Sequence, residues 1–142
     1  MDPRLFHHVA SLPSPDAALE LMCGSMVAEG YVDEGFLEDV LDRERRSSTS
    51  FGEQFAVPHS LYMDAHRTGI SVLSCDQPIA WGQGAVRLVV LFAVASAQRR
   101  LFRDALDQLI AVLADPSAVQ ALLSRSTTHE ALIRSLAALL DG

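Results

Sequence analysis

The chain has 142 residues, of which 49% are hydrophobic and 20% charged, a composition typical of a soluble globular domain. Its net charge is -7 and it contains no run of like charges, which argues against direct binding of DNA or RNA. The longest apolar stretch, near 86–95, is too short to cross a bilayer, so membrane insertion is not expected. No apolar segment follows Arg4 as it would in a signal peptide. We therefore expect a cytoplasmic protein.

Two helices are predicted in the first third of the chain. Ser14–Asp16 combines a capping serine, a proline suited to the first turn and an aspartate suited to the positive helix end. Apolar residues then recur at helical spacing until Gly30, where the helix should stop. A second helix is predicted from Asp33 to about Arg46, with three arginines in its last turn, where cations favour the helix dipole.

Strands are predicted in the middle of the chain. Phe51–Val57 is short and precedes Pro58, which suits a strand that runs into a turn. Gly69–Leu73 and Val86–Ala95 are rich in β-branched residues. The second is almost continuously apolar, as expected for a strand that is covered on both faces. The segment 5–12 is a candidate edge strand.

Three more helices are predicted after the strands, beginning near Leu101, Asp115 and Thr127. Helices before and after a block of strands predict an α/β (α+β) sandwich, with a small mixed central sheet of four or five strands and helices on both faces. Residues 1–142 should form a single domain.

Few residues are candidates for chemistry. The chain has no phosphate-binding loop of the Walker type, no dinucleotide-binding glycine pattern and no GxSxG motif, and Gly82–Gly84 is best interpreted as a turn. A metal or hydrolase centre formed by His59, Asp64 and His66 is an alternative, but their spacing matches no recurring ligand motif. We expect no metal and no cofactor. His59 follows a proline at the end of a predicted strand, a place where functional side chains are displayed.

The segment from Arg43 to His59 resembles the signature of the type-2 (mannitol/fructose) enzyme IIA of the bacterial sugar phosphotransferase system. That signature has an Arg-Glu pair, then a threonine and a glycine, and ends in Ala-Val-Pro-His. Arg43, Thr49, Gly52 and His59 stand at the matching positions. Downstream, Pro78–Gly82 resembles the Pro-Ile-x-Trp turn of the family, and the likeness covers nearly the whole chain. The resemblance implies a mannitol-type IIA fold over residues 1–142.

The resemblance also implies a phosphoryl relay centred on His59. In the family, this histidine accepts a phosphoryl group from the phosphocarrier protein HPr and passes it to a IIB component. Neutral imidazole is the nucleophile, and an ordinary pKa of about 6.5 leaves much of it neutral in the cytosol. Arg43 should lie beside His59 and face the phosphate with its rigid fork of donors. Thr49 either assists phosphate binding or only caps the turn, and both alternatives stay open.

One residue departs from the family pattern. IIA transporters usually carry a second histidine at the start of the helix after the apolar strand, and Phe102 stands at the best-matching position. Phenylalanine can neither donate a hydrogen bond nor carry a proton. With phenylalanine at this position, the chain more closely resembles the IIA-like module of transcription factors of the BglG/MtlR type. The leading expectation is therefore regulation of sugar-operon transcription. The alternatives are sugar transport through a IIB component and a docking module that is no longer phosphorylated.

Overall fold

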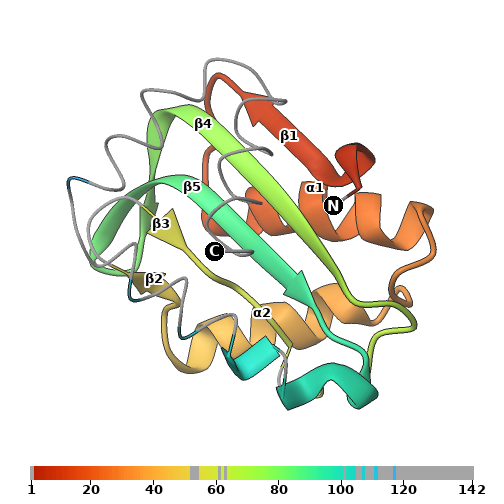
Figure 1. Ribbon diagram of the computed structural model, residues 1–142. Coiled ribbons are helices and arrows are strands. Elements are labelled where there is room, and N and C mark those ends of the chain that lie inside the picture. The colour runs from red at the N-terminus through yellow and green to blue at the C-terminus, as the bar shows by residue number, and fades with distance from the viewer. Residues whose placement is uncertain are drawn as a thin grey trace.

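The computed structural model describes residues 2–51, 55–60, 62, 64–100, 102–104, 107, 111 and 117. Their helices and strands, in chain order, are β1 (Phe6–Val9), α1 (Pro15–Ala28), α2 (Phe36–Arg46), β2 (Ser50–Phe51), β3 (Phe55–Ala56), β4 (Gly69–Trp81) and β5 (Gly84–Ala93), with short 3-10 helices at Pro3–Leu5 and Ser96–Gln98. The strands form one five-stranded sheet in the order β1-β4-β5-β3-β2, and α1 and α2 lie on the same face of it (Figure 1).

The sheet is mixed, as predicted. β4 and β5 form an antiparallel hairpin, whereas β1 pairs parallel to β4 and β3 pairs parallel to β5. The predicted edge strand in 5–12 is confirmed as β1. The predicted turn at Gly82–Gly84 is confirmed as well: Gly82 has a φ of 56°, a left-handed conformation that glycine adopts without steric cost.

Two strand predictions need correction. Phe51–Val57 is not one strand, because β2 and β3 pair with each other in antiparallel fashion, with Ser50 opposite Ala56. The strand predicted over Gly69–Leu73 continues to Trp81, so that Pro78 lies within β4 rather than in a turn. The register of β4 and β5 shifts between Ser74 and Ile79. Proline has no N–H to donate to a regular ladder of hydrogen bonds, but at such an irregularity no donor is needed at its position, so it is tolerated there.

The two predicted N-terminal helices are confirmed, one with a shifted start. Ser14 caps α1 by accepting a hydrogen bond from the amide of Ala17 at 3.2 Å. Helix α2 starts at Phe36 and not at Asp33. The amide of Phe36 donates to the carbonyl of Asp33 at 3.0 Å, so the residues between them form a turn that precedes the helix.

Both faces are buried in the central part of the sheet. On the helical face, side chains of α1 and α2 pack against alternate residues of β4 and β5; this cluster includes Leu19, Met22, Met26, Val40, Leu41, Leu73, Val89 and Leu91. The other face presents Val72, Leu88, Val90 and Phe92, all less than 5% exposed. Burial of each such side chain contributes about 1.5–3 kcal/mol. Burial on both faces therefore explains why 86–95 is almost continuously apolar, as predicted from the sequence.

Helical cover on the second face is described only in part. Residues 99–100 and 102–104 are helical, and the ring of Phe102 packs edge-on against Phe92 with centroids 5.0 Å apart. The rest of this predicted helix is described only at isolated positions, and the helices predicted from Asp115 and Thr127 lie outside the described residues apart from residue 117. In the part of the chain that is described, no helix is both long and apolar enough to cross a membrane.

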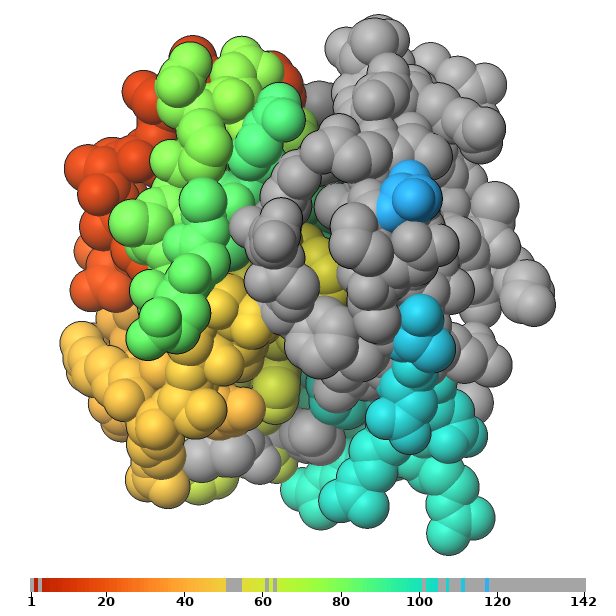
Figure 2. Space-filling view, turned by 90° about the vertical axis from the view of Figure 1, so that its left-hand side faces the viewer, coloured from red at the N-terminus to blue at the C-terminus, as the bar shows by residue number. Residues whose placement is uncertain are grey.

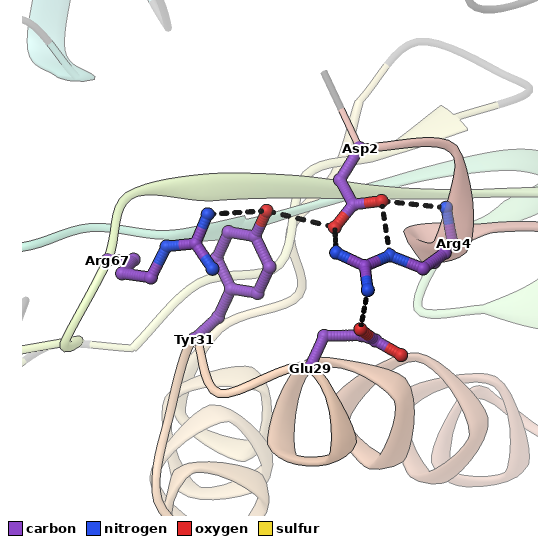
Figure 3. A network of polar contacts seen from close by, with 5 residues as sticks. All are labelled: Asp2, Arg4, Glu29, Tyr31 and Arg67. Carbon is purple, nitrogen blue, oxygen red and sulfur yellow. Dashed lines mark hydrogen bonds and ion pairs between the residues drawn. The ribbon is translucent and has the colours of Figure 1, made fainter.

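A polar network ties the N-terminus to the rest of the fold (Figure 3). The Asp2 carboxylate accepts hydrogen bonds from the backbone and the guanidinium of Arg4 and from the hydroxyl of Tyr31, and Arg4 holds the pKa of Asp2 well below its usual range. Arg4 also pairs with Glu29 at the end of α1. The guanidinium of Arg67 lies 4.3 Å from the centre of the Tyr31 ring. The Tyr31 ring is therefore held in place from two sides.

This fixed ring makes Gly69 sensitive to substitution. A Cβ atom at Gly69 would lie 2.6 Å from two carbons of the Tyr31 ring. Because the ring cannot move without breaking the network, we expect Gly69→Ala to lower the free energy of unfolding by about 1–3 kcal/mol, the usual cost of overpacking. Urea unfolding followed by circular dichroism measures the change.

The matched control is Gly84→Ala, in the neighbouring strand. There the nearest atom to an added Cβ is 3.5 Å away, which is an ordinary contact. Equal unfolding midpoints for the two variants would contradict this account of Tyr31.

Candidate functional site

His59 is anchored at the edge of the sheet by the strand beside it. The amide of Phe92, at the end of β5, donates to the carbonyl of Pro58 at 3.1 Å, and His59 forms an isolated parallel bridge with Phe92. This bridge keeps the register of β3 and β5, since Phe55 pairs with Leu88 and both pairs are separated by 33 positions (88 − 55 and 92 − 59). The sheet therefore sets the position of the His59 backbone.

One hydrogen bond sets the orientation of the imidazole. His59 Nδ1 lies 3.0 Å from the carbonyl oxygen of Val57. A carbonyl can only accept, so Nδ1 carries the proton in this bond, and the neutral ring keeps its lone pair on Nε2. The side chain is half-buried.

The surroundings of His59 favour its neutral form. Burial lowers the pKa of His59 below its ordinary value, and the nearby charge of Arg43 lowers it further, while the Val57 carbonyl and the charge of Glu44 act in the opposite direction. A neutral imidazole with a free Nε2 lone pair is a nucleophile.

Arg43 lies where the sequence predicted it, in the last turn of α2. It is close enough to His59 for its charge to lower the pKa of the imidazole. Arg43 Nη1 donates to the carbonyl of Ser47 at 2.7 Å, which holds the guanidinium at the C-terminal end of the helix. A guanidinium has five N–H donors, so this bond leaves most of the fork available for an anion.

The environment of Thr49 favours the capping alternative over a role in phosphate binding. Its hydroxyl donates to Glu44 Oε2 at 2.7 Å, and its amide donates to Glu44 Oε1 at 2.7 Å. Thr49 is itself buried. Glu44 could be predicted from sequence only as the second residue of the Arg-Glu pair, because its contacts with Thr49 and Trp81 depend on tertiary structure. Gly52 lies outside the described residues, so its supporting role stays a prediction.

Phe102 lies against the imidazole. The rings of His59 and Phe102 are tilted by 53° with centroids 5.6 Å apart. The phenylalanine therefore forms a wall of the site and supplies no polar atom there. This is the position expected if Phe102 takes the place of a second histidine.

The alternative centre of His59, Asp64 and His66 does not assemble. His66 Nε2 lies 2.7 Å from Asp33 Oδ1, and this partner raises the pKa of His66. Within the described ranges, no group of three or more histidine, cysteine, aspartate or glutamate side chains could hold a metal ion.

The fold and the site define a family. The chain matches, over residues 2–137, the family described as the phosphoenolpyruvate-dependent sugar phosphotransferase system, EIIA 2. The chain belongs to this family, and the predicted mannitol-type IIA fold is confirmed. The solved complex of enzyme IIAMTL and phosphorylated enzyme IIBMTL from Escherichia coli superposes with a TM-score of 0.79 at 20% identity, covering 97% of each chain.

Curated relatives include both carriers and regulators. The multiphosphoryl transfer protein of Escherichia coli O157:H7 is 32% identical over 118 residues, which are 81% of this chain and 31% of that protein. The probable licABCH operon regulator of Bacillus subtilis (strain 168) is 28% identical over 119 residues, 84% of this chain and 19% of that protein. The chain thus spans a third or less of the length of these two relatives.

His59 and His66 should titrate on opposite sides of 6.5, the ordinary pKa of histidine. His59 should protonate below it, and His66 above it. Because the charge of Arg43 lowers the pKa of His59, Arg43→Gln should raise the midpoint of His59 and leave that of His66 unchanged. Asp33→Asn should lower the midpoint of His66 and leave that of His59 unchanged, because Asp33 raises the pKa of His66. NMR titration of the imidazole signals gives both midpoints, and a His59 midpoint above that of His66 would contradict the described environment.

Proposed function

We propose that residues 1–142 form a phosphoryl-carrier domain that acts in the cytoplasm and accepts its phosphoryl group on Nε2 of His59. The observation that carries the proposal is the hydrogen bond from Nδ1 to the Val57 carbonyl, which leaves Nε2 with the lone pair. Family membership supports it, since the matched family is named for phosphoenolpyruvate-dependent transfer. The proposed donor is the phosphohistidine of HPr.

The proposed transfer needs no group other than the two imidazoles and a cation. The Nε2 lone pair attacks phosphorus, a P–N bond forms on His59, and the electron pair of the broken P–N bond returns to the ring of the donor. His59 keeps its Nδ1 proton, so its ring becomes more positive as the new bond forms. The Val57 carbonyl stabilises that charge through its hydrogen bond. Arg43 spreads positive charge over the phosphoryl oxygens in the loose transition state.

We propose further that the domain serves regulation of sugar-operon transcription rather than rapid sugar transport. Phe102 supports this, because a ring packed beside His59 shields a phosphohistidine from water and supplies no donor or proton for onward transfer. An operon regulator is among the relatives. In a regulator, the acceptor of the signal is another domain of the transcription factor; in transport, it is a IIB component.

Phosphoryl uptake and release test both parts. The chain is incubated with phosphoenolpyruvate, enzyme I and HPr, and intact mass is followed over time, with and without a IIB domain. The unaltered chain should gain one phosphoryl group and transfer it slowly to IIB. His59→Ala should gain none, because the nucleophile is absent. Phe102→His should release the group to IIB faster, since histidine restores a donor beside the site.

Each alternative function predicts a different time course of phosphoryl uptake and release. Rapid transfer to IIB by the unaltered chain, unchanged in Phe102→His, would contradict the regulatory role and favour sugar transport. Absence of phosphate from the unaltered chain would contradict the carrier function and favour a docking module. Phosphate on His59→Ala would place the acceptor elsewhere.

A further inference from the structure

Glu44, which follows Arg43 in α2, accepts three hydrogen bonds. Glu44 Oε1 accepts from the amide of Thr49 at 2.7 Å and from Trp81 Nε1 at 2.6 Å, and Oε2 accepts from the Thr49 hydroxyl at 2.7 Å. Distances this short are typical of bonds to an ionised carboxylate. Thr49 and Trp81 are both buried. In Figure 2 the segment of β4 and β5 (green) lies against the segment that contains α2 (yellow-orange). The hydrogen bond from Trp81 in β4 to Glu44 in α2 joins these two elements.

Two hydrogen bonds connect Thr49, which Glu44 holds, to the imidazole of His59. The amide of Val57 donates to the carbonyl of Thr49 at 3.2 Å. The carbonyl of Val57, the same residue, accepts from His59 Nδ1. A displacement of Thr49 therefore displaces the residue whose carbonyl selects the tautomer of His59.

We propose that Glu44 is a positioning residue of the phosphoryl site, which holds Thr49 and, through the Thr49–Val57 hydrogen bond, keeps the Val57 carbonyl against His59 Nδ1. The proposal rests on the proposed function of His59 and adds to it a residue that acts on the nucleophile through its neighbours.

The geometry of Glu44 has to be separated from its charge, because that charge also raises the pKa of His59. Two substitutions achieve this. Glu44→Gln loses the charge but can keep every bond: its Oε1 can accept from Thr49 N–H and Trp81 Nε1, and its amide can donate to the Thr49 hydroxyl, which also accepts. Glu44→Asp keeps the charge but withdraws the carboxylate by one methylene.

The tautomer of His59 is read from long-range ¹⁵N–¹H NMR spectra of the unphosphorylated chain, and uptake is read as the rate of phosphorylation by phospho-HPr. Glu44→Asp should populate the tautomer with the proton on Nε2 and slow uptake by at least about tenfold, since misplacement of about 1 Å can cost about 100-fold. Glu44→Gln should keep the Nδ1–H tautomer and a rate within about threefold of the unaltered chain. Thr49→Val, which removes the hydroxyl held by Glu44, should act in the same direction as Glu44→Asp.

Glu38→Asp and Glu38→Gln are the matched controls, because Glu38 is exposed in the first turn of the same helix; neither should change the tautomer or the rate. A wild-type tautomer in both Glu44→Asp and Thr49→Val would overturn the proposal. The proposal would also be overturned if the rate of phosphorylation fell as much in Glu44→Gln as in Glu44→Asp, because the effect would then come from the charge of Glu44. Absence of uptake by the unaltered chain would contradict the proposed function, while the tautomer would still decide the role of Glu44.

Discussion

The hydrogen bond between His59 Nδ1 and the Val57 carbonyl is the interaction on which the site depends. It determines which nitrogen of the ring bears the proton, and therefore which nitrogen keeps the lone pair that the proposed phosphoryl transfer uses. The bond is available because Pro58 and His59 are held against the end of β5, so that the chain cannot relax away from the ring. The parallel pairing of β3 with β5, which starts at Phe55, therefore also positions the backbone of His59.

Charge around the imidazole comes from two adjacent residues of one helix. Arg43 lowers the pKa of His59, and Glu44 raises it. Arg43 favours a neutral nucleophile and an anionic ligand, while Glu44 is engaged by Thr49 and Trp81 and holds the backbone in register. The helix therefore supplies both the cation of the site and its internal support. Phe102 supplies only an apolar wall beside His59, which supports the regulatory role proposed for the domain.

The sequence was sufficient for those features that depend on local pattern. The cap at Ser14, the candidate edge strand near the N-terminus and the apolar strand covered on both faces were predicted from residue type and spacing, and the structure has them. The parallel orientation of the edge strand is known only from the structure. The division of the strand predicted over Phe51–Val57 into β2 and β3 was missed because each has only two residues, too few to show a period. The extension of β4 past Pro78 was missed because a proline ordinarily ends a strand, and only the register shift explains it.

Knowledge of the site divides in the same way. The resemblance pointed to Arg43 and His59, and the fold brings the charge of one to bear on the other. No pattern in the sequence revealed that the Thr49 hydroxyl is turned to Glu44, because that contact forms between the last turn of α2 and the residue just before β2. Nor did the sequence distinguish the two nitrogens of His59, which differ only through the backbone carbonyl of a residue two positions earlier.

The central claim is that the backbone has already selected the nucleophilic nitrogen before any phosphoryl group arrives. The most direct test is the ¹⁵N NMR spectrum of the phosphorylated chain, in which coupling to phosphorus identifies the bonded nitrogen. The account predicts phosphorus on Nε2 of His59, with the proton retained on Nδ1. Phosphorus on Nδ1 would require the bond to Val57 to break, and would contradict the account.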